Sequence, residues 1–180
     1  MSTAAQTAPP VPIRFSLADV EAANDAWGCN CGPGAVAAIL GMTLDEIRPH
    51  LGDFERKGYT NPTLMWSILR SAGAASFIQN RTMDWPSYGL ARVQWDGPWT
   101  KPGVPLAARY RHTHWVGARY EGAETEIFDI NAMSEGGWIS FALWRDSLVP
   151  WLLGECEPKA TGGWWITHSV EVVPAYGATP

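Results

Sequence analysis

The segment NCGPGAVAAILG, residues 30–41, predicts a buried helix that opens at a cysteine. Pro33 would lie in the first turn, where a missing N–H does no harm, and Gly41 follows the last apolar residue as a stop signal. The residues between them are small and apolar, so this helix can pack closely against its neighbours. Cys31 is therefore expected at the N-terminus of the helix.

The position predicted for Cys31 suits a nucleophile. Unpaired amides and the positive end of the helix dipole stabilise an anion there, which lowers the pKa of a thiol. The same amides can hold the oxyanion that forms when a carbonyl is attacked, with the side chain of Asn30 or Asn24 as a second donor. The simpler alternative is that Cys31 is a small buried hydrophobe, as most free cysteines are. Cys29 lies in the preceding loop, and we expect it to be a structural or incidental thiol.

Two further helices are predicted in the first half of the chain. The sequence Thr43-Leu44-Asp45-Glu46 is a capping box, which predicts a short helix that ends near residues 50–51. Another helix is expected over residues 62–72, because apolar residues recur on one side and Gly73 follows as a stop. Residues 1–13 are rich in proline and small polar residues, and we expect a flexible lead-in there, before a single domain over residues 14–180.

The second half of the chain has strand-like composition between glycine and proline residues. Strands are expected over residues 76–79, 90–95, 106–111, 114–120, 125–130 and 164–173, and one more helix over residues 141–148. Helices followed by antiparallel strands place the chain in the α+β class, with N-terminal helices packed on a C-terminal antiparallel sheet.

A hairpin is predicted to present a base to the cysteine. Residues 112–120 can pair with residues 125–131 through a tip at Gly122 and Ala123, which places His114 opposite Asn131 and Val116 opposite Asp129. Because side chains alternate along a strand and paired residues share a face, His114, Asp129 and Asn131 would project to one side. A carboxylate or amide there would fix the imidazole tautomer and leave the other ring nitrogen to accept the thiol proton.

Two other interpretations of these residues stay open. His114 can be a satisfied histidine of the sheet, with Asp129 and Asn131 serving only at the turn where a strand ends. Zinc would accept two thiols and two imidazoles, although each pair here is separated by one residue instead of the usual two to four. The four residues concerned are Cys29, Cys31, His112 and His114. We expect neither a metal nor a cofactor.

Composition excludes several classes of protein. A net charge of −5 with only 13 Lys and Arg residues argues against a nucleic-acid partner, because phosphate binding needs a basic surface. No apolar run is long enough to cross a membrane, and no signal-peptide pattern opens the chain, so we expect a cytoplasmic protein without a membrane partner. The odd number of cysteines then predicts reduced thiols. The eleven tryptophans are expected mainly in the core, with a substrate groove as the alternative.

These residues resemble the papain-like cysteine peptidase superfamily, and above all the peptidase domains that process the double-glycine leaders of bacteriocins, with their stand-alone relatives. The likeness covers roughly residues 24–144. It is carried by Asn30-Cys31-Gly32-Pro33-Gly34-Ala35, by the short helix after Thr43, by His114-Trp115-Val116-Gly117 and by Ile127-Phe128-Asp129-Ile130-Asn131. The resemblance implies a papain-like fold with Cys31, His114 and Asp129 as a catalytic triad.

The chain departs from the pattern of that family at two places. Family members carry a glutamine several residues before the cysteine as oxyanion donor, whereas this chain has Asn24 and Asp25 there. The usual Asp-Pro at the third triad position is Asp129-Ile130, which leaves Asn131 as a competitor for that role.

The function expected from these residues is that of a cysteine hydrolase, a peptidase or amidase that acts on a peptide or protein substrate through a thioester. Hydrolysis and transamidation would use the same residues. With no P-loop and no membrane span, the resemblance implies a stand-alone enzyme, encoded by a phage, another mobile element or a bacterial accessory locus. The alternative is an inactive papain-like scaffold that binds a partner or builds an assembly, with residues 95–99 and the pair Trp164-Trp165 as its contact surface.

Overall fold

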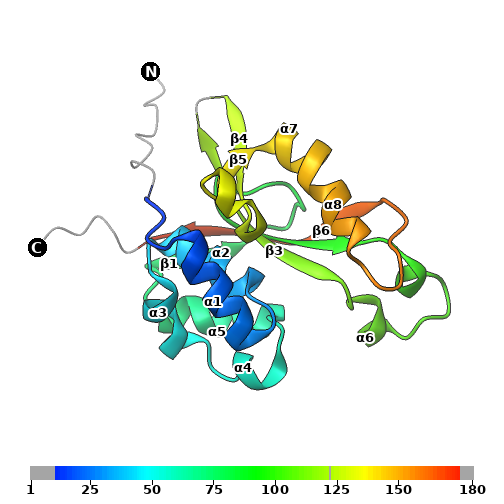
Figure 1. The fold of residues 1–180 in the computed structure, drawn as a ribbon, viewed down its shortest axis with the longest axis horizontal. Coiled ribbons are helices and arrows are strands. Elements are labelled where there is room, and N and C mark those ends of the chain that lie inside the picture. Colours follow the sequence, from blue (N-terminus) through cyan, green and yellow to red (C-terminus); the bar gives the residue numbers. More distant parts are fainter. Residues whose placement is uncertain (1–10, 122, 175–180) are drawn as a thin grey trace, which may run out of the picture.

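The computed structural model describes residues 11–121 and 123–174, which form a mixed α+β structure. Helices precede and cover a six-stranded sheet, as the sequence predicts for the fold class (Figure 1). The α-helices are α1 (Leu17–Trp27), α2 (Cys31–Leu40), α3 (Leu44–Ile47), α4 (Phe54–Lys57), α5 (Pro62–Ser71), α6 (Leu106–Arg109), α7 (Phe141–Leu143) and α8 (Val149–Gly154). The other helical segments are the 3-10 helices η1 (Arg48–His50), η2 (Pro98–Thr100) and η3 (Ile130–Glu135) and the π-helix η4 (Trp144–Leu148).

The sheet is antiparallel throughout, and its strand order is β1-β6-β2-β3-β4-β5. The strands are β1 (Ser76–Gln79), β2 (Tyr88–Trp95), β3 (Thr113–Glu121), β4 (Glu124–Phe128), β5 (Trp138–Ser140) and β6 (Trp164–Val173). The last strand in the sequence therefore lies inside the sheet, between β1 and β2. In Figure 1, α1 to α5 gather on one side of the sheet and α7 and α8 on the other.

Alternation along the strands divides the buried residues into two clusters. The first joins the helices to one face of the sheet, where Leu90, Trp115 and Phe128 point. The second fills the opposite face beneath α7, η4 and α8, and Val93, Val116 and Ile127 belong to it. Because neighbouring residues of a strand point to opposite faces, each central strand contributes to both clusters.

Helix α2 has the form that its small residues predict. Its residues from Gly32 to Leu40 are all buried, and Gly41 ends the helix in the left-handed conformation. Two of its glycines let other segments approach closely, since a Cβ on Gly34 would lie 2.2 Å from Cδ1 of Ile130 and one on Gly32 would lie 2.3 Å from Oγ1 of Thr60. The absence of these side chains lets α2 lie close to the segment that follows β4, at Gly34, and to the loop before α5, at Gly32.

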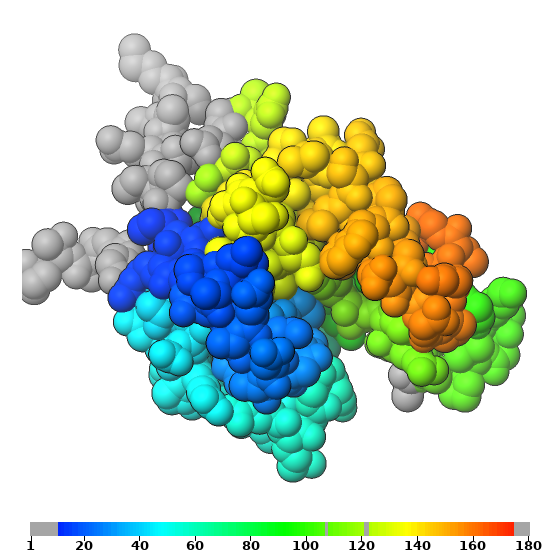
Figure 2. Space-filling model, in the orientation of Figure 1, coloured from blue at the N-terminus to red at the C-terminus, as the bar shows by residue number. Residues whose placement is uncertain are grey.

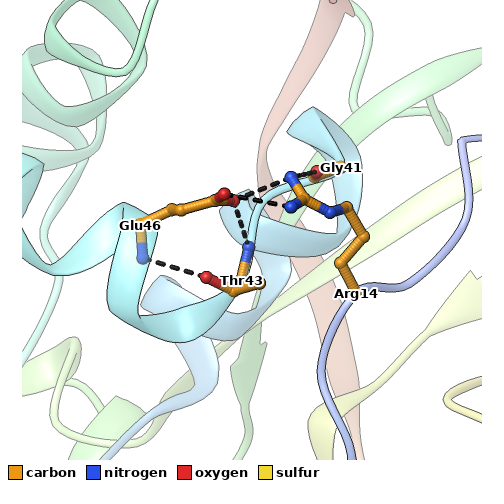
Figure 3. Close-up of polar contacts among 4 residues, drawn as sticks. All are labelled: Arg14, Gly41, Thr43 and Glu46. Carbon is orange, nitrogen blue, oxygen red and sulfur yellow. Dashed lines mark hydrogen bonds and ion pairs between the residues drawn. The ribbon is translucent and has the colours of Figure 1, made fainter.

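The predicted capping box starts α3 and also holds the N-terminal segment (Figure 3). Glu46 N–H donates to the Thr43 hydroxyl at 3.1 Å, and the Glu46 carboxylate accepts from the Thr43 N–H at 2.9 Å. The same carboxylate receives two hydrogen bonds from the Arg14 guanidinium, which also donates to the carbonyl of Gly41. One side chain thus caps a helix and anchors the chain that leads into α1.

Most of the predicted elements are present, and one is wrong. Residues 106–111 do not form a strand: Leu106–Arg109 is the short helix α6, which suits a Leu-Ala-Ala-Arg sequence after Pro105. Helices α1 and α4 and the strand β5 were not predicted. Of the expected flexible lead-in, residues 1–10 lie outside the described residues, whereas Ile13 packs against the first cluster.

The predicted hairpin register is confirmed for residues 117–121, where Gly117 pairs with Phe128 and Tyr120 with Thr125. Its tip at Gly122 lies outside the described residues. Beyond Phe128 the chain turns into η3 instead of continuing as a strand to Asn131. Within the described part of the chain, no helix is both long and apolar enough to cross a membrane.

Candidate active site

Cys31 is the first residue of α2, as the sequence predicts, and its side chain is partly buried. The carbonyl of Asn30, the residue before it, accepts the N–H of Gly34 at 2.9 Å and so closes the first turn. The side-chain amide of Asn30 donates to the carbonyl of Val20 in α1 at 3.1 Å. This bond fixes the start of α2 against α1, and the thiol sits at the end of the helix where amides are free to bind an anion.

His114 and Asp129 form a buried pair on the other side of the site. His114 lies on β3 and Asp129 directly follows β4, and Nε2 of the imidazole is 2.8 Å from Oδ2 of the carboxylate. An ionised carboxylate only accepts hydrogen bonds, so Nε2 carries the proton of this bond. The neutral tautomer then leaves Nδ1 as the nitrogen that can accept a proton.

The carboxylate of Asp129 is held from two more directions. Oδ1 accepts the main-chain N–H of Asn131 at 3.0 Å and its side-chain amide at 2.9 Å. Oδ2, which bonds His114, also accepts the indole N–H of Trp144 at 2.9 Å. The structure therefore places Asp129 at the imidazole, and the polar contacts found for Asn131 serve to hold Asp129. Trp144 lies 15 residues farther along the chain, and no motif in the sequence marked it.

Burial and charge act in opposite directions on this pair. Burial alone would lower the pKa of His114, but the nearby Asp129 carboxylate and its hydrogen bond raise that pKa above the usual 6.5. Burial would raise the pKa of Asp129, but the charge and hydrogen bond of His114, with the bonds from Asn131 and Trp144, lower that pKa below 3.8. Each group thus favours the charged form of the other.

The cysteine reaches the edge of β3 because β4 is short. Pairing between the two strands ends at Gly117 and Phe128, so residues 113–116 have no partner on the side of β4. There the sulfur of Cys31 accepts the main-chain N–H of Trp115, the residue after His114. Cys31 and the histidine therefore approach the same stretch of strand, although the His114 side chain belongs to the face opposite the helices.

Cys29 is the residue whose importance the sequence did not reveal. Its thiol is hydrogen-bonded to that of Cys31, which lowers the pKa of Cys29 to about 6, and the charge of His114 also lowers that pKa. The same bond, together with burial, raises the pKa of Cys31 well above 9.0, because Cys31 holds the proton that is donated. The two sulfurs therefore behave as one group that releases its first proton readily and its second with difficulty.

The candidate oxyanion donors have different surroundings. Asn30 is buried, and its side-chain amide already donates one hydrogen bond to the carbonyl of Val20. Asn24 is exposed and lines a cavity of about 320 Å³ together with Asn30 and Asn131, a cavity that Cys31 does not line. The main-chain amides at the start of α2, which follow Cys31 directly in the sequence, remain the candidate donors to an oxyanion.

The four residues considered for zinc are divided by the structure. Cys29 and Cys31 are in contact, and His114 is bonded to Asp129, whereas the ring of His112 packs against Trp99 with a centroid distance of 4.2 Å. Among residues 11–121 and 123–174, no three His, Cys, Asp or Glu side chains gather in a way that could hold a metal ion.

Comparisons with protein-family models, with curated proteins and with solved structures find no match to this chain. A relationship to papain-like peptidases therefore stays a prediction from the sequence.

Proposed function

We propose that this protein is a cysteine hydrolase, a peptidase or amidase, with Cys31 as nucleophile, His114 as base and Asp129 as the residue that orients the base. One observation carries the proposal: a buried imidazole, bonded to a buried carboxylate, interacts electrostatically with Cys29, whose thiol is hydrogen-bonded to that of Cys31 at the N-terminus of a helix. Structural histidines rarely combine these three features, whereas thiol-dependent acyl transfer needs all of them.

The proposed reaction begins when the thiol proton passes to Nδ1 of His114. The Cys31 sulfur then attacks the carbonyl carbon of an amide, and the amides at the start of α2 stabilise the oxyanion. As the C–N bond breaks, His114 returns the proton to the leaving amine and a thioester remains on Cys31. Water, deprotonated by His114, releases the acid and restores the thiol; an amine in place of water would give transamidation.

A papain-like arrangement is part of this proposal. Its support is the order of the parts along the chain: the cysteine opens a helix that is covered by others, the histidine lies on a later strand, and the aspartate follows the next strand. The substrate would be a peptide or protein. The chain's three cysteines are free, which fits a reducing compartment such as the cytoplasm.

The alternative of a binding scaffold loses part of its expected contact surface. Trp95 and Trp99 are buried, and only Trp165 of the pair at residues 164–165 is exposed. All the tryptophans except Trp151 and Trp165 are buried or partly buried, so most of them serve the core.

The test is the rate of iodoacetamide labelling at each cysteine against pH, located by mass spectrometry. We expect rapid labelling of the native protein below pH 7 that falls by about 100-fold in H114A, because general-base assistance contributes about 10²–10⁴-fold. His50→Ala is the matched control, since His50 lies in η1 and bonds Ser71 of α5 at 2.9 Å, away from Asp129 and the two thiols.

Variants of each cysteine identify the nucleophile. C31S should abolish fast labelling, whereas C29S should retain it at Cys31, because Cys31 loses the neighbour whose hydrogen bond and charge raise its pKa. Fast labelling that survives in C31S would instead assign the reactive thiolate to Cys29. Slow labelling of both thiols in the native protein would contradict the enzyme and favour the scaffold.

A further inference from the structure

Arg92 is a buried arginine without an acidic partner. It lies on β2 with 6% of its surface exposed, and it pairs with Trp115 on one side and His168 on the other. Its guanidinium donates to the Thr113 hydroxyl at 3.1 Å and lies over the ring of Tyr110, 5.4 Å from the centroid. Its Nε is buried and has no hydrogen-bond partner.

No carboxylate among the described residues lies within 4.0 Å of this guanidinium. Four of the more exposed arginines do bond acidic side chains, namely Arg14, Arg48, Arg56 and Arg145. An arginine cannot lose its charge to escape burial, and an unpaired buried cation is costly. Arg92 is therefore a buried cation that could pair with an anion.

The unpaired cation lies close to the candidate nucleophile. The charges of Arg92 and Cys31 interact, and the strand neighbour of Arg92, Trp115, donates its main-chain N–H to the Cys31 sulfur. Tyr110 and Thr113, which contact the guanidinium, are exposed and partly exposed. Figure 2 shows the surface hollowed between the helical half of the chain and the segment around α6, the segment that ends at Tyr110.

We propose that Arg92 binds a carboxylate of the substrate, either an acidic side chain or a C-terminal carboxylate, beside the bond that Cys31 attacks. A planar guanidinium with free N–H groups matches a carboxylate with two parallel hydrogen bonds, and burial strengthens the attraction. The neighbouring imidazole of His168 does not compete, because burial and then the charge of Arg92 lower its pKa and keep it neutral. This inference rests on the proposed function and adds a substrate class to it.

The test uses two alkylating reagents of similar size that differ by one charge, iodoacetate and iodoacetamide. The quantity compared is the rate of Cys31 labelling by iodoacetate divided by the rate of labelling by iodoacetamide. We expect this ratio to be about tenfold lower in R92Q than in the native protein. R92K should keep much of the ratio because it keeps the charge. R70Q is the matched control, since Arg70 lies over the ring of Phe77 on the exposed side of α5.

Protection experiments identify the source of the carboxylate. Short acetylated peptides with Glu or Gln, each ending in a carboxylate or an amide, are added while iodoacetamide labels Cys31 in the native protein. We expect protection only by peptides that carry a carboxylate, at the Glu side chain or at the C-terminus, and we expect that protection to be lost in R92Q. Protection by the free terminus alone would assign the site to C-terminal carboxylates, and protection by the Glu side chain alone would assign it to acidic residues.

The inference and the proposed function fail separately. If R92Q slows both reagents equally, Arg92 acts on the thiolate and the carboxylate site is wrong, while the enzyme proposal stands. If the rate ratio is unchanged and acidic peptides give no protection, the inference is likewise overturned. If native Cys31 reacts slowly with both reagents, the proposed function fails first.

Discussion

The two faces of the sheet carry different halves of the candidate site. On the helical face, small residues let α2 lie close to Ile130 and Thr60, and Cys31 at the start of α2 contacts the edge of β3. On the opposite face, large aromatic rings enclose His114 and Asp129: Trp95 stacks on the imidazole at 6.0 Å, and Trp144 bonds the carboxylate. The helical face thus positions Cys31 by close packing of α2, and the opposite face positions His114 and Asp129 by surrounding them with aromatic rings.

Adjacent residues of β3 show the division most directly. Trp115 points to the helices, and its indole donates to the carbonyl of Thr60 at 2.8 Å. His114 points the other way and bonds Asp129. The period of two along a strand therefore separates the anchor of the helical half from the base of the site. Substitutions on the helical face should consequently act through packing, and substitutions on the opposite face should act through the charges of His114 and Asp129.

The largest effect on stability is expected from crowding the helical face. Gly34→Ala would place a Cβ 2.2 Å from Ile130, so packing must shift, and we expect the free energy of unfolding to fall by about 1–3 kcal/mol. Gly154→Ala in α8 is the control, because a Cβ there meets nothing within 4 Å and should stabilise the helix slightly. Equal urea midpoints for the two variants would show that close approach is not needed.

A smaller effect is expected from weakening the aromatic face. Trp144→Phe keeps most of the ring but removes the hydrogen bond to Oδ2 of Asp129. Because Oδ2 keeps its bond to His114, the free energy of unfolding should fall by only about 0.5–1.5 kcal/mol at pH 7. Labelling of Cys31 should also slow, because the carboxylate that orients His114 loses a support. Trp85→Phe is the control, since Trp85 packs edge-on against Trp144 without bonding Asp129. Equal labelling rates in both variants would show that the bond has no part in the site.

The smallest expected effect is the pH dependence of the buried pair. The raised pKa of His114 adds stability that is complete below about 6.5 and is lost as the pH rises through the folded value. The lowered pKa of Asp129 adds stability that is complete above 3.8 and is lost as the pH falls through its folded value. The stability difference between native protein and H114Q, measured by urea unfolding, should therefore be larger at pH 5–6 than at pH 9. A constant difference would mean that the pair is neutral in the folded protein.

Local patterns in the sequence account for much of what the structure contains. The capping box at Thr43, the glycine stop at Gly41 and the hairpin register each depend on residues only a few positions apart. The prediction that Asp129 and His114 share a side followed from that register, and the 2.8 Å contact agrees with it.

The rest depends on contacts between distant segments. Trp144 and Arg92 have no local signature, since each gains its role from strands and helices that the fold brings together. Cys29 was set aside because a loop position offered no reason for a low pKa, yet the path of the loop places its thiol on Cys31. The strand expected at residues 106–111 was wrong because six residues carry too little pattern to outweigh helical propensity after a proline.

The place of β6 inside the sheet has a consequence for how the molecule forms. Residues 164–173 pair with both β1 and β2, and Val170 meets Leu90 and Gln79 across long stretches of chain. Without these residues β1 would have no strand to join, because β6 is its partner in the sheet. Contacts of such long sequence separation slow folding, because loop closure precedes the gain from pairing. Strand β6, the last strand of the described residues, is thus the one that joins β1 to the rest of the sheet, and it also places His168 beside Arg92.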